Sequence, residues 1–250
     1  MKLRTLFLAS ALALTVSLPA FSQGKVYVIT NEGHRVYGTG LQADRQGNLK
    51  LEIEEGKVTR PFQKGEYRAA YTPLPKAVRN LQVAFSKGEF DYIDKRAGDA
   101  LEKYGYLGWG TMILYIRAKV ALDRNEPQQA LEYLKRANEY PAISQIKIYW
   151  YRGMAETYVA LQEYDDANRY IEQILKHVKT PKMVAAMFNL KGDINAAQDK
   201  NKEAALQYMK NVLLFDREEI GASTYDTAKN KLVELLRDMN DARYREFEKL

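Results

Sequence analysis

The sequence of 250 residues contains no cysteine and only two histidines, His34 and His177. Without cysteine, the chain has no disulfides, thiolate catalysis, iron–sulfur clusters, cysteine-based zinc sites or lipid-modified cysteine anchor. The two histidines lie far apart, and the sequence lacks a glycine-rich phosphate loop and a serine nucleophile elbow. We therefore expect no enzymatic activity, no catalytic residues, no bound metal and no cofactor.

The sequence also lacks a long run of charges of one sign. Lys and Arg total 38 and Asp and Glu total 32, which gives a formal net charge of +6, and the two signs alternate along most of the chain. Nucleic-acid-binding proteins usually concentrate their basic residues in one run or on one face. The charge pattern therefore disfavours nucleic acid as a partner.

One apolar run stands out near the amino terminus. Lys2 and Arg4 precede the run Leu6–Leu18, and the small residues Ala20 and Ser22 follow it with one residue between them. This order is typical of a secretory signal peptide, and the apolar run of about 13 residues is shorter than the roughly 20 that a membrane span requires. We expect residues 1–22 to be removed after Ser22. The exported chain, periplasmic or secreted, would then have no integral membrane span.

Residues 23–72 show a period of two, which predicts strands. Leu49, Leu51 and Ile53 alternate with charged residues, and turn signals separate five such segments. Pro61 is expected to end one strand because proline cannot donate to a ladder. The predicted strands cover 25–30, 34–39, 49–54, 57–60 and 66–71. They indicate a small antiparallel β-barrel, similar to SH3-like folds.

Two roles fit this small barrel. It could cap the apolar end of the helices that follow, which is the role we favour, or it could bind a ligand by itself. In the second role, four aromatic side chains would stack on a cell-wall glycan or peptide: Tyr27, Tyr37, Phe62 and Tyr67.

After Pro75 the period changes to 3.6, which predicts helices to the end of the chain. The predicted helices cover 75–87, 89–104, 108–124, 127–139, 143–162, 164–178, 181–199, 201–216 and 222–239. Gly105–Gly110, between two of them, is interpreted as a connector. The short loops indicate antiparallel neighbours. The fold class is therefore α+β, predominantly α, with a β-barrel over 23–72 and an α-α superhelix over 75–250.

A spacing of 37 residues repeats within this helical part. The positions that share it are Ile93, Ala130, Ala167 and Ala204. Small side chains are needed where two helices cross about 8–10 Å apart, and one hairpin alone cannot bury its apolar face. A fixed internal period of this length therefore predicts a solenoid of stacked hairpins.

The hairpin from Tyr151 to Pro181 resembles the tetratricopeptide repeat family. Its matching residues include Met154, Ala155, Tyr158 and Ala167. The resemblance covers roughly residues 75–216, about four hairpins. It implies packing between helices at six positions: Ile93, Ala130, Tyr158, Ala167, Gly192 and Ala204.

In this family the first helix of each hairpin lines a concave groove that binds a protein. The resemblance places eight residues in that groove: Met112, Tyr115, Lys119, Tyr149, Arg152, Glu156, Asn189 and Asp193. We expect the groove to bind an extended peptide or a helix, with Tyr115, Tyr149 and Arg152 as anchors, because Tyr and Arg are enriched at binding hot spots. An ordinary solvated surface is the other interpretation.

The sequence therefore predicts a non-enzymatic scaffold or adaptor in the bacterial cell envelope, with another protein or peptide as its partner. The alternative is a ligand-binding module for cell-wall glycan or peptide, built on the β-barrel. The sequence does not identify the partner.

Overall fold

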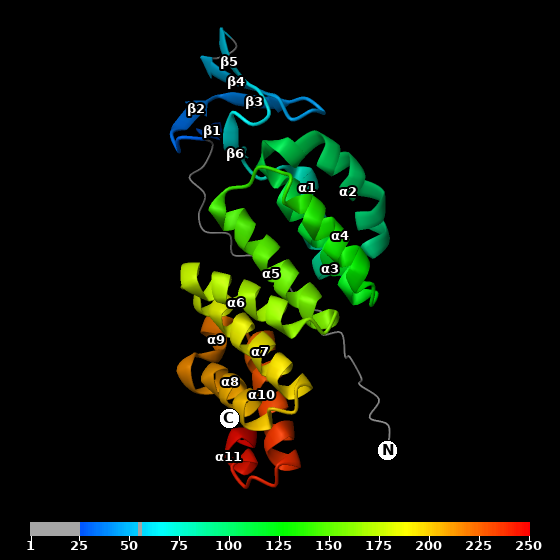
Figure 1. Cartoon of the computed structure of the whole chain (residues 1–250), viewed down its shortest axis with the longest axis vertical. Coiled ribbons are helices and arrows are strands. Elements are labelled where there is room, and N and C mark those ends of the chain that lie inside the picture. The colour runs from blue at the N-terminus through cyan, green and yellow to red at the C-terminus, as the bar shows by residue number, and fades with distance from the viewer. Residues whose placement is uncertain (1–25, 55–56) are drawn as a thin grey trace. The chain divides into compact units, whose positions relative to one another are not determined.

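The computed structural model describes residues 26–54 and 57–250 (Figure 1). The predicted signal peptide, residues 1–22, lies outside these described residues. The chain divides into two compact units, Met1–Gly153 and Met154–Leu250, with the boundary inside helix α5 (Ser144–Ala160). The strands and the first helices belong to one unit, and each unit is described by itself.

The strands of the first unit form two antiparallel sheets of three strands each. One has the order β2 (Arg35–Gly38), β1 (Val26–Thr30), β6 (Tyr67–Tyr71), and the other has the order β3 (Gly40–Ala43), β4 (Leu49–Glu54), β5 (Val58–Phe62). The strands of the described part of the chain do not close into a barrel, so the predicted barrel is corrected to this pair of open sheets.

The predicted strand 34–39 is divided because the chain crosses between sheets at Gly38–Gly40. A Cβ atom on Gly38 would lie 2.3 Å from the Glu52 carbonyl oxygen, and one on Gly40 would lie 2.5 Å from the Glu52 side chain. At Gly38 the approach is to the backbone of β4, which only glycine permits, whereas at Gly40 it is to a side chain that can move. Gly38 therefore allows β2 to end in one sheet close to the β4 backbone before β3 begins in the other sheet.

The prediction that Pro61 ends a strand is wrong. Pro61 lies inside β5 and is paired with Lys50 of β4. The sheet order places β5 at an edge, where one row of N–H groups faces away from the neighbouring strand. A proline at such a position removes no ladder hydrogen bond.

The core of the strands includes part of the helical region. Val28, Leu49 and Leu51 pack with Leu107, which belongs to η1 (Gly105–Trp109), the kinked turn between α2 and α3. Gly108 in this turn has φ +98°, and a Cβ atom there would lie 2.2 Å from the Ala70 carbonyl oxygen. The strands therefore bury their apolar faces directly against the α2–α3 turn.

Helical hairpins follow the strands in the first unit, as the green helices of Figure 1 show. They are α1 (Lys76–Ser86), α2 (Phe90–Tyr104), α3 (Gly110–Asp123) and α4 (Pro127–Ala137), followed by the start of α5. Prolines begin or precede two of them, since the first helical turn needs no N–H donor there. The observed ends agree with the predicted ranges to about two residues.

The second unit continues with helices on from the end of α5. They are α6 (Tyr164–His177), α7 (Pro181–Ala197), α8 (Asn201–Leu214), the short α9 (Arg217–Ile220), α10 (Ala222–Asp238) and α11 (Tyr244–Glu248). The single turn α9 was not expected from the sequence. The buried core of this unit includes Ala204, Tyr208, Ile220, Ala228 and Leu232.

The 37-residue period is present in the backbone as well as in the side chains. The turn inside each of four hairpins has one residue with positive φ at the same place in the repeat: Gly88 (71°), Asn125 (60°), Gln162 (63°) and Asp199 (58°). The next residue donates its N–H to the carbonyl five positions earlier: Glu89 to Ala84, Glu126 to Ala121, Glu163 to Tyr158 and Lys200 to Asn195. This left-handed helix end recurs in all four hairpins.

Five of the six predicted packing positions are buried, and the sixth, Tyr158, is half-buried. Ile93, Ala130, Ala167 and Ala204 are completely buried. Gly192 is buried as well. Tyr158 is half-buried and its ring stacks on that of Tyr170 at 5.6 Å.

Candidate functional site

Five of the predicted groove residues lie in the first unit, on α3 and α5. Met112 is 2% exposed and Tyr115 is 1% exposed. Helix α3 packs against α1, α2 and α4, so it is buried on nearly all sides. This burial corrects the prediction that Met112 and Tyr115 face a partner.

The other three groove residues of the first unit remain partly accessible. Lys119, Tyr149 and Arg152 are half-buried. The Tyr149 ring lies 5.6 Å from that of Tyr115, and burial raises the pKa of Tyr149 above its usual value. Of the five predicted groove residues in this unit, these three are the ones that are partly exposed.

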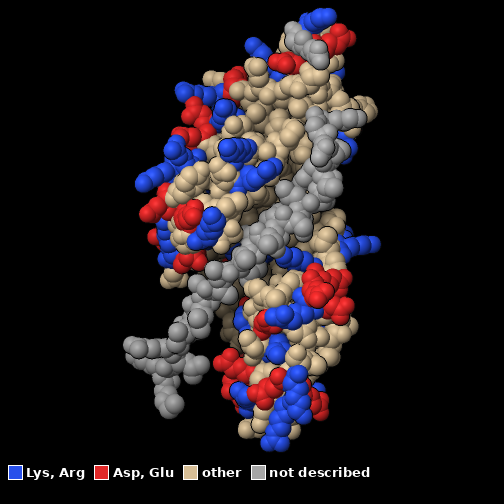
Figure 2. Space-filling model, turned by 180° about the vertical axis from the view of Figure 1, so that it is seen from behind, with Lys and Arg blue, Asp and Glu red and all other residues tan. Residues whose placement is uncertain are grey.

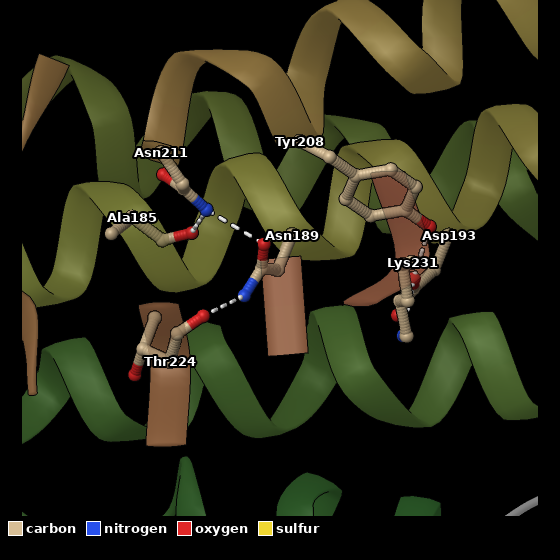
Figure 3. Close-up of polar contacts among 7 residues, drawn as sticks. All are labelled: Ala185, Asn189, Asp193, Tyr208, Asn211, Thr224 and Lys231. Atoms are coloured by element: carbon tan, nitrogen blue, oxygen red, sulfur yellow. Dashed lines mark hydrogen bonds and ion pairs between the residues drawn. The ribbon is translucent and has the colours of Figure 1, made fainter. Parts of the chain in front are cut away.

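In the second unit, Glu156 is half-buried on α5, and Asn189 lies on α7 within a polar network (Figure 3). Asn189 Nδ2 donates to the Thr224 carbonyl oxygen of α10 at 3.1 Å. Asn211 Nδ2 of α8 donates to Asn189 Oδ1 at 2.7 Å and to the Ala185 carbonyl oxygen at 2.8 Å. The amide of Asn189 therefore connects three helices.

Asp193 has a similar role one turn further along α7 (Figure 3). Its Oδ1 accepts a hydrogen bond from the Tyr208 hydroxyl at 2.5 Å and lies 2.6 Å from Lys231 Nζ. Burial, followed by the nearby Asp193 carboxylate, raises the pKa of Tyr208 far above its usual value. Asn189 and Asp193 are half-buried, and their polar atoms join α7 to α8 and α10, so their place in a groove stays a prediction.

The aromatic residues of the alternative function are divided between core and surface. Phe62 is 3% exposed and Tyr67 is 7% exposed, and the Tyr67 hydroxyl donates to the Gly47 carbonyl oxygen at 2.6 Å. Tyr27 stacks on Tyr71 at 5.1 Å, whereas Tyr37 is 48% exposed. Phe62 and Tyr67 thus belong to the core of the sheets, which corrects their prediction as stacking residues for a ligand.

The first unit contains a pocket that was not predicted from the sequence. Its volume is about 310 Å³, and it lies among the β5–β6 loop, η1 and the segment from the end of α4 into α5. Aromatic and basic side chains dominate its lining: Lys64, Arg68, Tyr106, Tyr140, Lys147 and Trp150. We call this site the junction pocket.

Close packing fixes the aromatic side of the junction pocket. The rings of Tyr106 and Tyr140 lie 4.9 Å apart, and a Cβ atom on Gly110 would lie 2.4 Å from the Tyr140 ring. Trp150 Nε1 donates to the Leu134 carbonyl oxygen at 2.7 Å. The glycines of the α2–α3 connector leave room for the Tyr140 ring. They were interpreted from the sequence only as a connector, and they are the sequence feature that relates to this site.

The basic side of the pocket consists of Lys64, Arg68 and Lys147. Lys64 Nζ lies 3.2 Å from the Tyr106 hydroxyl and 5.3 Å from the centre of its ring, and Lys147 Nζ lies 6.0 Å from the Trp150 ring. Glu139 also lines the pocket. Within the described ranges, no ion pair links any of the three cations to a carboxylate.

A second hollow of about 410 Å³ shares the Tyr106–Tyr140 wall. Its lining adds three further cations and one carboxylate: Arg45, Arg117, Arg136 and Glu102. Arg45 pairs with Glu102 at 2.6 Å, and Arg117 Nη2 donates to the Tyr133 hydroxyl at 2.7 Å. Elsewhere, on the face seen in Figure 2, basic and acidic side chains are interleaved.

Two other kinds of feature were sought in residues 26–54 and 57–250. No group of three or more His, Asp or Glu side chains there is arranged to hold a metal ion. No helix in that part of the chain combines the length and the apolar character that crossing a membrane requires.

The hairpins and their recurring turns define an α-helical repeat protein. Residues 63–235, more than half of the chain, match the family model of the tetratricopeptide repeat-like domain. The chain therefore belongs to the tetratricopeptide repeat-like domain family. No curated protein and no solved structure matched the chain in the corresponding comparisons. Repeats of this kind are typically interaction modules without catalytic activity.

Proposed function

We propose that the protein is a non-enzymatic scaffold or adaptor of the bacterial cell envelope that binds another protein. Membership of the tetratricopeptide repeat-like family is the observation that carries this proposal. Stacked hairpins offer a preformed surface, which lowers the ordering cost of binding. The protein would then act by holding its partner, without forming or breaking a covalent bond.

Helix α5 is the element on which we place the partner contact of the first unit. Tyr149 and Arg152 are half-buried and, being three residues apart, lie on one side of α5. Lys147 and Trp150 lie on another side of the same helix, where they line the junction pocket. Tyr, Trp and Arg combine a large contact area with a polar group, which favours them at binding hot spots. With Lys119 of α3, Tyr149 and Arg152 form what we call the proposed contact surface.

Export is part of the proposal and rests on the sequence alone. It is supported by the positive residues Lys2 and Arg4, the apolar run Leu6–Leu18 and the small residues Ala20 and Ser22. Determining the amino-terminal residue of the protein purified from its own cells tests this part. A chain that starts at Gln23 supports export, and one that keeps residues 1–22 contradicts it.

Photo-crosslinking in cells tests the partner contact. A benzoylphenylalanine at Lys119, in the proposed contact surface, should give an adduct with one protein after irradiation. The same group at Lys135, which is exposed on α4, serves as the control. The proposal fails if neither position gives a protein adduct, or if both give the same set of adducts.

The alternative, a glycan-binding β domain, has less support because Phe62 and Tyr67 are core residues. Deleting the strands would not test it cleanly, since the deletion would uncover Leu107, which packs in their core. The exposed side chain of Tyr37 is a better target. Loss of cell-wall binding in a Tyr37→Ala variant would favour the alternative.

A further inference from the structure

We propose that the junction pocket binds an acidic segment of the partner protein, an extended stretch in which carboxylates flank one aromatic or apolar side chain. This inference rests on the proposed function, because it names the chemistry of the partner that the scaffold would hold. It goes beyond the family resemblance, which placed the contact in the groove of the helices and not at the junction with the strands.

Charge is the first argument for an acidic ligand. Lys64, Arg68 and Lys147 line the pocket with Glu139 as the one carboxylate of its lining. None of the three cations has an ion-pair partner among the described residues. Charge-assisted hydrogen bonds to carboxylates are among the strongest polar contacts that a protein makes. A carboxylate placed between Lys64 and Lys147 would complement this excess of positive charge.

Rigidity is the second argument. The ring of Tyr140 lies against the backbone of Gly105 and Gly110, where a Cβ atom would come within 2.6 and 2.4 Å of it. Tyr106 packs in the same manner on Gly47, at 2.7 Å from the position of a Cβ atom. A wall held this closely loses little side-chain freedom when a ligand binds, which favours affinity. Its aromatic surface suits an apolar or aromatic side chain.

Size and continuity indicate an extended chain. A volume of about 310 Å³ lies at the lower end of the range for ligand pockets, about 300–1,000 Å³. The second hollow begins on the same Tyr106–Tyr140 wall and adds Arg136, which has no ion pair in the described part of the chain. A peptide that crosses the wall would therefore place a carboxylate on each side of it.

A peptide array tests this inference on the mature chain, residues 23–250. The probes are immobilised octapeptides with one central Tyr and zero to four Glu residues, each matched by a peptide with Gln in place of Glu. Binding should increase with the number of Glu residues and decrease with added salt, because the charges of the pocket are partly exposed. The Gln peptides should bind at least tenfold more weakly.

Two variants connect the binding to the pocket. Lys64→Gln combined with Lys147→Gln should lower the affinity for the acidic peptides at least tenfold. Lys135→Gln combined with Lys202→Gln removes the same number of charges from exposed positions outside the junction pocket and should have little effect. Circular dichroism of each variant checks that the fold is kept.

Four results would overturn the inference: equal binding of Glu and Gln peptides, equal losses in the two double variants, no binding of any peptide, or binding of an acidic oligosaccharide such as polygalacturonate in place of the peptides. The crosslink at Lys119 separates this failure from that of the proposed function. One such result is that the Lys64/Lys147 variant still forms the protein adduct at Lys119 when acidic peptides do not bind. That result would support the proposed scaffold function and contradict the assignment of the junction pocket to an acidic segment.

Discussion

At the scale of single residues, the polar side chains on α7 show how a position predicted for a groove can also hold helices together. Asn189 and Asp193 are polar residues at positions where the family resemblance expects a groove. Both are bonded to α8 or α10 within the second unit. A polar side chain at a given helix position has the same identity in either role, so the sequence cannot separate the roles without knowing which helix packs there.

The hydrogen bond from Tyr208 to Asp193 gives the first prediction. Tyr208→Phe removes this bond to a charged group, and we expect a loss of about 1–3 kcal/mol in the free energy of unfolding at pH 7. Urea unfolding monitored by circular dichroism measures it. Tyr92→Phe, a change at an exposed tyrosine of α2, should have little effect.

The same variant should also respond differently to alkaline pH. The folded state raises the pKa of Tyr208 above 10.0. Below about pH 10 the Tyr208 hydroxyl keeps its proton in both the folded and the unfolded state. Above that pH the unfolded state releases the proton first, so the free energy of unfolding decreases as the pH rises. The wild type should therefore lose free energy of unfolding through this hydroxyl above pH 10, whereas Tyr208→Phe should not. The difference in free energy of unfolding between the two proteins should become smaller there. A constant difference from pH 7 to 11 would show that Tyr208 is not held in its neutral form.

At the scale of elements, the helices followed closely from the sequence because their determinants are local. The 3.6 period, the prolines at helix starts and the buried residue where the two helices cross all lie within a hairpin. The strands depended on distant contacts: the division of one strand at Gly38–Gly40 depends on Glu52, and the position of Pro61 depends on the edge of a sheet. The junction pocket depends on segments distant in sequence in the same way.

The recurring turn gives a prediction for a whole hairpin. Gln162 has φ 63°, whereas the equivalent position of the first hairpin is Gly88. A residue with a Cβ atom costs roughly 1 kcal/mol or more in the left-handed region, and glycine avoids most of this cost. Gln162→Gly should therefore raise the free energy of unfolding by about 0.5–1 kcal/mol.

Thermal unfolding of the Gln162→Gly variant measures this effect. The control is Gln173→Gly, at an exposed position inside α6, which should destabilise by about 1 kcal/mol because glycine weakens a helix interior. A Gln162→Gly variant that is as unstable as the control would mean that this turn does not need a left-handed residue.

At the scale of the whole molecule, the sequence predicted the helical repeat architecture better than it predicted the site. Stacked hairpins follow from the repeat and agree with the family match. The contact residues did not follow, because Met112 and Tyr115 are covered by the helices around α3. The pocket lining did not follow either, because it comes from one strand, the turn η1, three helices and the loops between them. Family position indicates which helix a residue occupies, but tertiary packing decides whether it reaches the surface.

Affinity capture with mass spectrometry tests the central claim, that this protein works by holding another protein, most directly. The bait is residues 23–250, used against an envelope extract from its own cells beside an Arg152→Ala, Lys119→Ala bait. The account predicts one protein that is retained by the unchanged bait, reduced by the double variant, and bound again when both proteins are purified. Retention of cell-wall glycan alone, equally by both baits, would contradict it.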